Sequence, residues 1–315
     1  MLVGICNALF KEITSNYDEC YKLAAELGYH SVDLSSSEWW SVGQIYKEEM
    51  FGFYDQSLEE LEEYYKPIYE AATKYGIIFN QLHAPFPTAR TGYPKLNDYI
   101  HMTIEKCIHI ARMLKSKYLV VHGVHVDNHR TVEEDFQYHM DLFSTLIPLL
   151  KEQGVVMCIE NTYYYYVGRI NCYSASNSEF LVRLVEKLNK KAGAECFGLC
   201  YDVGHGNITG KDQFQEILAY GDHLKVLHIH DTDGTFDTHL IPYTARYTDR
   251  QGTDWEGVLK ALAKINYNGV INFESDGGIR GFPKELRKAV LRLNAEIGKY
   301  FSDRIEAYKK EYQKA

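Results

Sequence analysis

Short apolar runs rich in β-branched residues recur along the chain and are separated by longer amphipathic segments. They cover 2–8, 31–35, 77–83, 118–122, 155–160, 197–202, 226–230 and 270–274. Most of these runs are apolar throughout instead of alternating, which is typical of parallel strands that are covered on both faces. The pattern therefore predicts eight strands of a parallel sheet.

The segments between these runs carry helical periodicity. Apolar residues recur every three or four positions in 97–115 and in 133–151, as on the buried face of an amphipathic helix. Ser57, followed three residues later by Glu60, matches a capping box, and Asp254 is expected to cap another helix. Strands and helices are therefore expected to alternate along the whole chain.

This alternation predicts the fold class. Eight strand–helix units in 315 residues indicate an α/β protein, a single-domain (β/α)8 TIM barrel over residues 1–300. A doubly wound open sheet is the alternative, but that fold carries a glycine-rich phosphate turn after its first strand, and no such turn follows here. Residues 301–315 are charged and helical in composition, which predicts a C-terminal helical extension.

Composition and charge narrow the class of protein. The net charge of −9 disfavours nucleic acid as a partner, because nucleic-acid-binding proteins present a basic face. No apolar run is long enough to cross a bilayer, so no membrane partner is expected. The N-terminal stretch lacks a basic leader and the seven cysteines lack C-x-x-C spacing, so we expect reduced thiols in a cytoplasmic protein. A small molecule is the expected partner, and assembly into a homo-oligomer is left open.

The last four predicted strands each end in a residue that binds metals. These residues are Glu160, Asp202, His228 and Glu274. The C-terminal ends of the strands in a parallel barrel converge on one face, so these side chains are expected to meet there. Three carboxylates with a single imidazole suit one divalent metal ion, with Mn²⁺ preferred and Mg²⁺, Co²⁺ or Zn²⁺ as alternatives.

Further histidines are expected at the same face. His83 and His122 close the third and fourth strands, and His205 follows the sixth strand by one short turn. Alternation along the seventh strand points His228 and His230 to the same side. We assign the deeper His228 as the metal ligand. The other histidines are assigned to substrate binding.

Together these motifs resemble the xylose isomerase-like TIM barrels, a superfamily of sugar and sugar phosphate isomerases and epimerases that also includes endonuclease IV. The resemblance covers roughly residues 2–300 and rests on Glu160-Asn161-Thr162, Asp202-x-x-His205, His228-x-x-Asp231 and Glu274. It implies that the four strand-end residues hold the metal, that Glu160 and Glu274 are also the catalytic acid–base pair, and that His205 contacts substrate. Gly234 is a departure, since some epimerases of this superfamily carry an arginine at about that offset.

Such a site suits proton transfer next to a carbonyl group. A divalent cation stabilises the enediolate that forms, and two carboxylates can remove a proton and return it. The sequence therefore predicts a metal-dependent isomerase or epimerase of a sugar, a sugar phosphate or a keto-polyol. A lyase or dehydratase acting on keto-sugars or keto-inositols would use the same metal and base and is an alternative. A barrel that serves only as a binding or regulatory subunit is the non-enzymatic alternative.

A metal-dependent phosphodiesterase similar to endonuclease IV is a further alternative. That enzyme holds three zinc ions with additional residues, and the matching positions here are His83, His122, His205, Asp237 and His239. The surrounding residues depart from its motifs, because PTARTGYP follows HAPF and GVHVDNH follows His122. The acidic net charge also disfavours DNA. We assign Asp237 and His239 to substrate binding, while further metal binding by these additional residues stays open.

The loops that follow the strands are expected to select the substrate. The indole face of Trp39 suits the apolar side of a sugar ring, and a packed loop anchor is the alternative for both Trp39 and Trp40. The tyrosines of 163–166 are candidates for a wall of the site. Arginine binds phosphate or carboxylate well, and the candidates in these loops are Arg90, Arg169, Arg246 and Arg280. If none of them points inward, a neutral sugar is favoured over a phosphorylated one.

Overall fold

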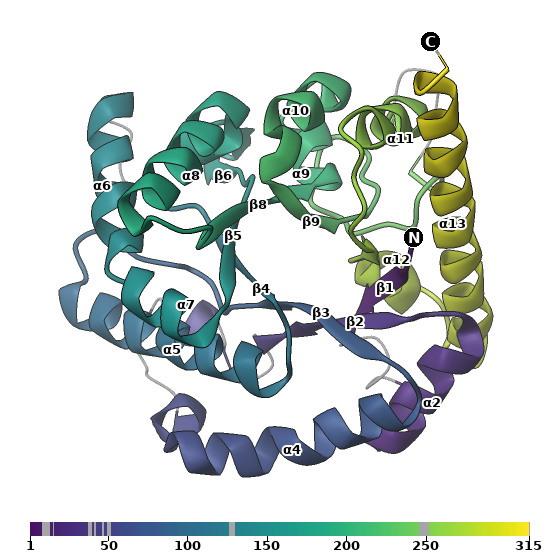
Figure 1. Cartoon of the computed structure of the whole chain (residues 1–315), viewed down its shortest axis with the longest axis horizontal. Helices are drawn as coiled ribbons and strands as arrows, with labels where there is room; N and C mark the ends of the chain where they lie inside the picture. The colour runs from purple at the N-terminus through teal and green to yellow at the C-terminus, as the bar shows by residue number, and fades with distance from the viewer. Residues whose placement is uncertain are drawn as a thin grey trace.

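Eight parallel strands form a nearly closed barrel with helices around it (Figure 1). Neighbouring strands follow the order β10-β1-β2-β3-β4-β5-β8-β9, and a parallel bridge between Ile229 and Phe273 joins the two ends of this sheet. The computed structural model describes residues 1–7, 13–14, 16–36, 40, 42–45, 47–48, 52–125, 130–245 and 252–314. The predicted (β/α)8 barrel is confirmed.

The barrel strands lie close to the segments expected from the apolar runs. They are β1 (Val3–Cys6), β2 (Ser31–Ser35), β3 (Ile78–His83), β4 (Tyr118–His122), β5 (Val156–Glu160), β8 (Phe197–Asp202), β9 (Leu224–His228) and β10 (Ile271–Phe273). The largest difference is at β9, which lies two residues earlier than predicted. Its pairing with β8 ends where His228 lies opposite Asp202, and the next residue, Ile229, forms the bridge to β10.

Helices fill the connections between the strands. They are α2 (Tyr17–Leu27), α3 (Val42–Ile45), α4 (Leu58–Lys74), α5 (Pro94–Met113), α6 (Val132–Ser144), α7 (Ile147–Gln153), α8 (Ser178–Ala192), α9 (Val203–Ile208), α10 (Gln213–Tyr220), α11 (Trp255–Lys264), α12 (Asp276–Arg280) and α13 (Lys284–Tyr312), with short 3-10 turns at Gly52–Asp55, Ser174–Ser176 and Gly221–His223. Ser57 and Glu60 form the predicted capping box, and Asp254 caps α11. The single helical pattern of 133–151 is instead two helices, because Pro148 lacks the N–H that would continue α6 into α7.

An antiparallel hairpin after β5 was not expected. Its strands are β6 (Tyr164–Tyr166) and β7 (Arg169–Asn171). Val167 and Gly168 connect them, both at positive φ, as the favoured two-residue hairpin turns require. The hairpin follows the C-terminal end of a barrel strand, so it stands at the face where the predicted site lies.

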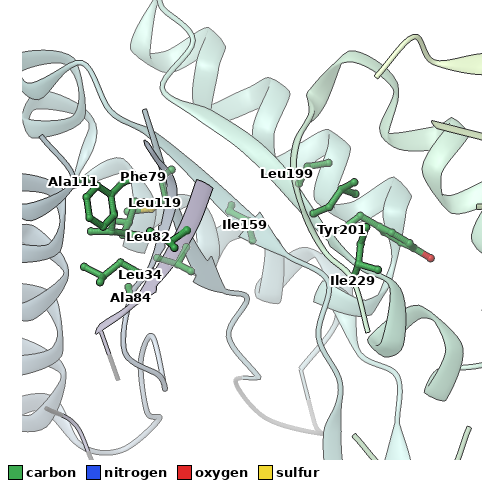
Figure 2. Close-up of a cluster of buried hydrophobic side chains, with 14 of the residues drawn as sticks. Leu34, Phe79, Leu82, Ala84, Ala111, Leu119, Ile159, Leu199, Tyr201 and Ile229 are labelled. Atoms are coloured by element: carbon green, nitrogen blue, oxygen red, sulfur yellow. The ribbon is translucent and has the colours of Figure 1, made fainter. Parts of the chain in front are cut away.

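The hydrophobic core has two layers. Outward-facing residues of the strands pack against the helices, and Figure 2 shows part of this layer, including Leu34, Leu119 and Leu199. A smaller apolar cluster lies apart from it and consists of Val120, Val156, Cys158, Cys200 and Val226. All seven cysteines are free, and six of them are buried, as expected for reduced thiols. Among the described residues, no helix is long and apolar enough to cross a membrane.

Candidate active site

Histidine, aspartate and glutamate side chains, which are able to bind a metal ion, close five strands of the barrel and follow a sixth. His83, His122, Glu160, Asp202 and His228 are the last residues of β3, β4, β5, β8 and β9, and Glu274 comes directly after β10. The parallel register places His122 beside Glu160 and Asp202 beside His228. We call these six residues the strand-end cluster. The convergence that the sequence predicted is therefore present in the fold.

The imidazole of His228 is at the centre of the strand-end cluster. Its Nδ1 atom lies 3.1 Å from Glu160 Oε1, 3.3 Å from Glu274 Oε2 and 3.9 Å from Asp202 Oδ2. The His228 side chain is fully buried. One ring nitrogen thus faces three carboxylates, so the four residues predicted to bind the metal lie together.

The other nitrogen of this ring contacts a residue that sequence reasoning missed. His228 Nε2 donates to Asp33 Oδ2 at 3.1 Å, and the same oxygen accepts from Gln81 Nε2 at 3.0 Å and Asn272 Nδ2 at 3.2 Å. Asp33 lies in the middle of β2 and is buried. The sequence did contain a signal for this contact, because an aspartate in the middle of an apolar strand needs a polar partner inside the barrel. Asp33 keeps a proton on Nε2, so Nδ1 is the nitrogen that faces the carboxylates and that can bind a metal ion once it has released its own proton.

Glu160 is surrounded by imidazoles. Its Oε2 atom lies 3.2 Å from His83 Nε2 and 3.4 Å from His122 Nε2, and its Oε1 atom lies 3.3 Å from His205 Nδ1. His83 also donates from Nδ1 to the carbonyl of Ala84 at 2.7 Å. Burial lowers the pKa of His83, but Glu160 outweighs it and raises this pKa, so the protonated ring also donates from Nε2 to Glu160. Glu160 is therefore held in one orientation by both of its oxygens.

The two glutamates differ in exposure and in protonation. Burial alone would raise the pKa of Glu160, but the nearby His228, His122 and His205 hold this pKa well below its usual range. Burial raises the pKa of Glu274, and His228 and His239 only partly oppose the rise. The Glu274 side chain is 22% exposed, whereas that of Glu160 is 1% exposed. Glu160 is thus a buried carboxylate, and Glu274 is the more solvent-exposed of the two.

A second group of histidine and aspartate side chains lies next to the first. We call His205, His230, Asp237 and His239 the loop cluster. Asp237 Oδ2 lies 3.3 Å from His205 Nε2 and 3.3 Å from His239 Nε2, and the rings of His230 and His239 stack at 4.1 Å. His230 Nε2 lies 3.1 Å from Asp202 Oδ2, which links the two clusters. Burial lowers the pKa of His239, but Asp237 and Asp276 outweigh it and raise the pKa to about 12.

Local backbone features position the loop cluster. Asp202 accepts from the backbone N–H of His205 and so caps α9, which brings His205 back over the strand ends. A Cβ atom on Gly204 would overlap the ring of His230, so this position has no room for a side chain. His239 Nδ1 donates to the carbonyl of Glu274 at 2.7 Å, which ties the long loop after β9 to the end of β10.

In the part of the chain that the structure describes, the carboxylates of the strand-end cluster and the loop cluster form ion pairs with histidines only. Among the described residues, Glu160, Asp202 and Glu274 have ion pairs with histidines and with no lysine or arginine. Four overlapping groups place their ligand atoms within 4.8 Å of one another: His83–Glu160–His228, Asp202–His228–Glu274, Asp202–His205–His230 and His230–Asp237–His239. Buried carboxylates without a cation are costly, so this donor set fits bound divalent metal.

A pocket opens beside the clusters, with a volume of about 640 Å³. His122, His205 and Asp237 lie at its inner end, and the loop after β3 and the β6–β7 hairpin form its walls. The tyrosines of 163–166 all line it, as predicted for a wall. We call this cavity the side pocket.

The tryptophans and arginines that were considered as substrate contacts differ in where the structure places them. Trp39 and Arg246 lie outside the described residues. Trp40 is buried, stacks on Tyr99 at 5.9 Å and donates to the carbonyl of Phe86, so it is a loop anchor. Arg280 pairs with Asp276 at 2.7 Å, and Arg169 is exposed on β7. The remaining arginine of this set, Arg90, lines the side pocket.

The fold and the site define the class: a (β/α)8 barrel with buried carboxylates and imidazoles at the C-terminal ends of its strands. A family model described as "Xylose isomerase-like TIM barrel" matches residues 21–294. The chain belongs to this family, which confirms the resemblance seen in the sequence. The uncharacterized protein y4fM of Sinorhizobium fredii is 28% identical over 169 residues, which cover 53% of this chain and 50% of that protein. The match spans only about half the length of this relative.

Several solved structures share the fold. A D-psicose 3-epimerase crystallised with D-fructose has a TM-score of 0.66 and 15% identity, covering 96% of this chain and 99% of its own. An IolI protein with a bound zinc atom has a TM-score of 0.61 and 18% identity, covering 98% and 99%. The 3-keto-D-glucoside 4-epimerase YcjR of E. coli has a TM-score of 0.57 and 14% identity, covering 88% and 94%. At these identities the likeness shows the common fold.

Proposed function

We propose that the protein is a metal-dependent isomerase or epimerase of a sugar or keto-polyol that moves a proton next to a carbonyl group. The observation that carries the proposal is the placement of Glu160 and Glu274, 3.1 Å and 3.3 Å from the same nitrogen of His228 at the barrel mouth. The epimerases with the same fold act on small sugars and on a keto-glucoside, which supports a substrate of this class.

The metal would be held by Asp202, His228 and Glu274 together with Glu160, and Mn²⁺ suits their oxygen-rich donor set. The zinc atom of the IolI structure supports a divalent ion in a barrel of this kind. A divalent ion bound there would stabilise the negative charge of an enediolate. His83, His122 and His205 orient Glu160 through both of its oxygens.

The chain's own residues supply the proton transfers. Glu274 is the more exposed carboxylate, and burial raises its pKa, so it is the candidate base that takes a proton from a bound molecule. Glu160 lies 3.1 Å from the same His228 nitrogen and is the candidate for the second proton position. Transfer to the opposite face of one carbon gives epimerisation, and transfer between neighbouring carbons gives isomerisation.

The contact between Asp33 and His228 gives a testable consequence for metal binding. Asp33→Asn is expected to weaken Mn²⁺ binding by roughly 10–100-fold, because outer partners of a metal-binding histidine typically contribute that much. The fully buried Asp33 Oδ1 has no hydrogen-bond partner among the described residues, so the amide N–H groups of asparagine would be unsatisfied there or would face His228. Titration with Mn²⁺ monitored by calorimetry measures the effect.

Ser31→Ala is the matched control for this substitution. Ser31 lies two residues earlier on β2 and is equally buried, and its hydroxyl oxygen likewise has no partner among the described residues. We expect the Mn²⁺ affinity of this variant to be unchanged. Equal Mn²⁺ affinities for Asp33→Asn and the unaltered protein would contradict the assigned role of Asp33.

The proposed reaction is tested by solvent exchange. The Mn²⁺-loaded protein is incubated in D₂O with ketohexoses, keto-inositols and 3-keto-glucosides, and deuterium at the carbon next to the carbonyl is followed by NMR. Proton transfer predicts incorporation into at least one compound at a rate that Glu274→Gln abolishes. Elimination of water from a compound, without exchange or epimer, would instead indicate a lyase. Absence of exchange across the whole panel would refute the proposal.

One observation favours a second candidate function. The four overlapping metal-binding groups include the whole loop cluster, so the site offers ligands for more than one metal ion. A multinuclear site of this kind suits hydrolysis of a phosphodiester. Metal counting by plasma emission beside a nicking assay on DNA with abasic sites separates the two candidates. One metal per chain without nicking favours the isomerase, and several metals with nicking favour the phosphodiesterase.

A further inference from the structure

The side pocket is larger than one sugar ring requires. Its volume of about 640 Å³ lies within the range of roughly 300–1,000 Å³ that pockets for drug-sized ligands have, and a monosaccharide is much smaller than such ligands. The inner end of the pocket reaches His122, His205 and Asp237, next to the strand-end cluster. A sugar ring that sits at the strand-end cluster would therefore leave most of the side pocket unfilled.

One wall of the side pocket is a fixed aromatic platform. The ring of Phe86 stacks on His122 with a centroid distance of 5.0 Å and an interplanar angle of 12°. Its side chain is 37% exposed, while the carbonyl of the same residue accepts from Trp40 Nε1 at 2.8 Å. The buried Trp40 thus holds the loop in place. Phe86 presents an apolar ring beside the entrance to the metal-binding residues.

The opposite wall is the aromatic β6–β7 hairpin. Tyr163 packs edge-on against His205 at 5.1 Å and donates from its hydroxyl to Asp237 Oδ2 at 3.1 Å. Tyr165 packs edge-on against Tyr163 at 5.4 Å and is 55% exposed. The hairpin is therefore anchored at its base to the loop cluster and exposes an aromatic ring further out. Aromatic rings with a polar tip are suited to contact the faces and hydroxyls of sugars.

Among the described residues, the lining of the side pocket has one arginine and no lysine, and its His205 is paired with Asp237 at 3.3 Å. Of the described lining residues, Arg90 is the single lysine or arginine, and its guanidinium lies 3.7 Å from the ring centroid of Tyr93. The neutral polar residues Thr88, Thr91 and Thr162 also line the pocket, and the hydroxyl groups of Thr88 and Thr162 are hydrogen-bonded to the carbonyl of His122 and to the Tyr173 hydroxyl. A phosphate group would meet one stacked guanidinium there, whereas a neutral polyhydroxylated ring would meet aromatic faces and hydroxyls.

We propose that the side pocket binds the second, neutral ring of a glycoside whose first ring lies at the strand-end cluster. The substrate class is then a disaccharide or other uncharged glycoside and not a free monosaccharide or a sugar phosphate. The position of the first ring rests on the proposed function. The second ring lies between Phe86 and Tyr165.

Binding of simple sugars to the Mn²⁺-loaded protein tests this assignment. Methyl β-D-glucopyranoside, the neutral disaccharides cellobiose, maltose and sucrose, and D-glucose 6-phosphate are titrated by calorimetry. The best disaccharide is expected to bind about tenfold more tightly than the methyl glucoside, as one or two aromatic contacts would provide. Phe86→Ala and Tyr165→Ala are each expected to remove most of this difference and to leave metal content and methyl glucoside affinity unchanged.

Tyr300→Ala is the control, because this side chain is 48% exposed on α13 and does not line the side pocket. It should keep the full preference for the disaccharide. The proposal would be overturned if every disaccharide bound with the same affinity as methyl glucoside, or if none of these sugars bound. Tightest binding of D-glucose 6-phosphate that is lost in Arg90→Ala would also overturn it. The deuterium-exchange assay tests the proposed reaction, whereas the calorimetric titrations test the second-ring site. Failure of one proposal can therefore be distinguished from failure of the other.

Discussion

Glu274→Gln is expected to lower the rate of proton exchange by roughly 10²–10⁴-fold, the contribution typical of a positioned acid or base. Glutamine keeps a carbonyl oxygen where the carboxylate was, so the metal-binding geometry with His228 and Asp202 is largely retained. The amide cannot accept the proton, however. Measurement of exchange in D₂O beside the Mn²⁺ content of the purified variant separates these two roles.

Glu160→Gln is expected to remove turnover as well, but with a different signature. Both oxygens of Glu160 face imidazole nitrogens. Glutamine would place an N–H₂ group, which can only donate, beside nitrogens that require a hydrogen-bond acceptor or a metal ion. We therefore expect lost metal together with lost exchange. Glu62→Gln, a change of the same kind on the exposed side of α4, serves as the control and should retain both. Full activity of Glu160→Gln or of Glu274→Gln on a substrate would contradict the assignment of these two residues as the acid–base pair.

Removal of the metal is the second change for which we expect a large effect. Dialysis against a chelator should abolish exchange, and Mn²⁺ should restore it. A ligand present at about 100 times its dissociation constant stabilises a protein by about 2.7 kcal/mol, so the melting temperature should rise by several degrees when Mn²⁺ is added. Differential scanning fluorimetry with and without Mn²⁺ measures this shift.

The pH dependence of metal binding has a defined sign. Burial lowers the pKa of His228, but Glu274, Glu160 and Asp33 outweigh it and hold the pKa well above its usual range in the metal-free protein. The ring is then protonated at neutral pH and must release a proton before Nδ1 can bind a metal ion. Mn²⁺ affinity should therefore increase as the pH rises.

His228→Ala should lose the Mn²⁺-dependent rise in melting temperature. His101→Ala, at a partly exposed site on α5, should keep it. Exchange activity that survives complete removal of the metal would show that the carboxylates act without it and would contradict the metal-dependent mechanism.

The periodicity of apolar residues was sufficient to predict the barrel. Runs that are apolar throughout require cover on both faces, and eight such runs separated by amphipathic helices leave few other arrangements. The parallel connection also makes the C-terminal end of every strand face the same side. Glu160, Asp202 and His228 could thus be predicted to meet, because position at a strand end is a property of the local sequence.

Contacts between strands that lie far apart in the chain could not be predicted from the periodicity of apolar residues. The hydrogen bond from His228 to Asp33 joins positions 195 residues apart, and it depends on the closure of the barrel and on which residues point inward. The stacking of His239 on His230 likewise depends on the path of the long loop after β9. The tyrosines of 163–166 became a wall because Tyr163 packs against His205 of the loop cluster and the next three tyrosines pair with β7 in the hairpin. Such placements arise from the pairing of distant segments, for which a single sequence carries no periodic signal.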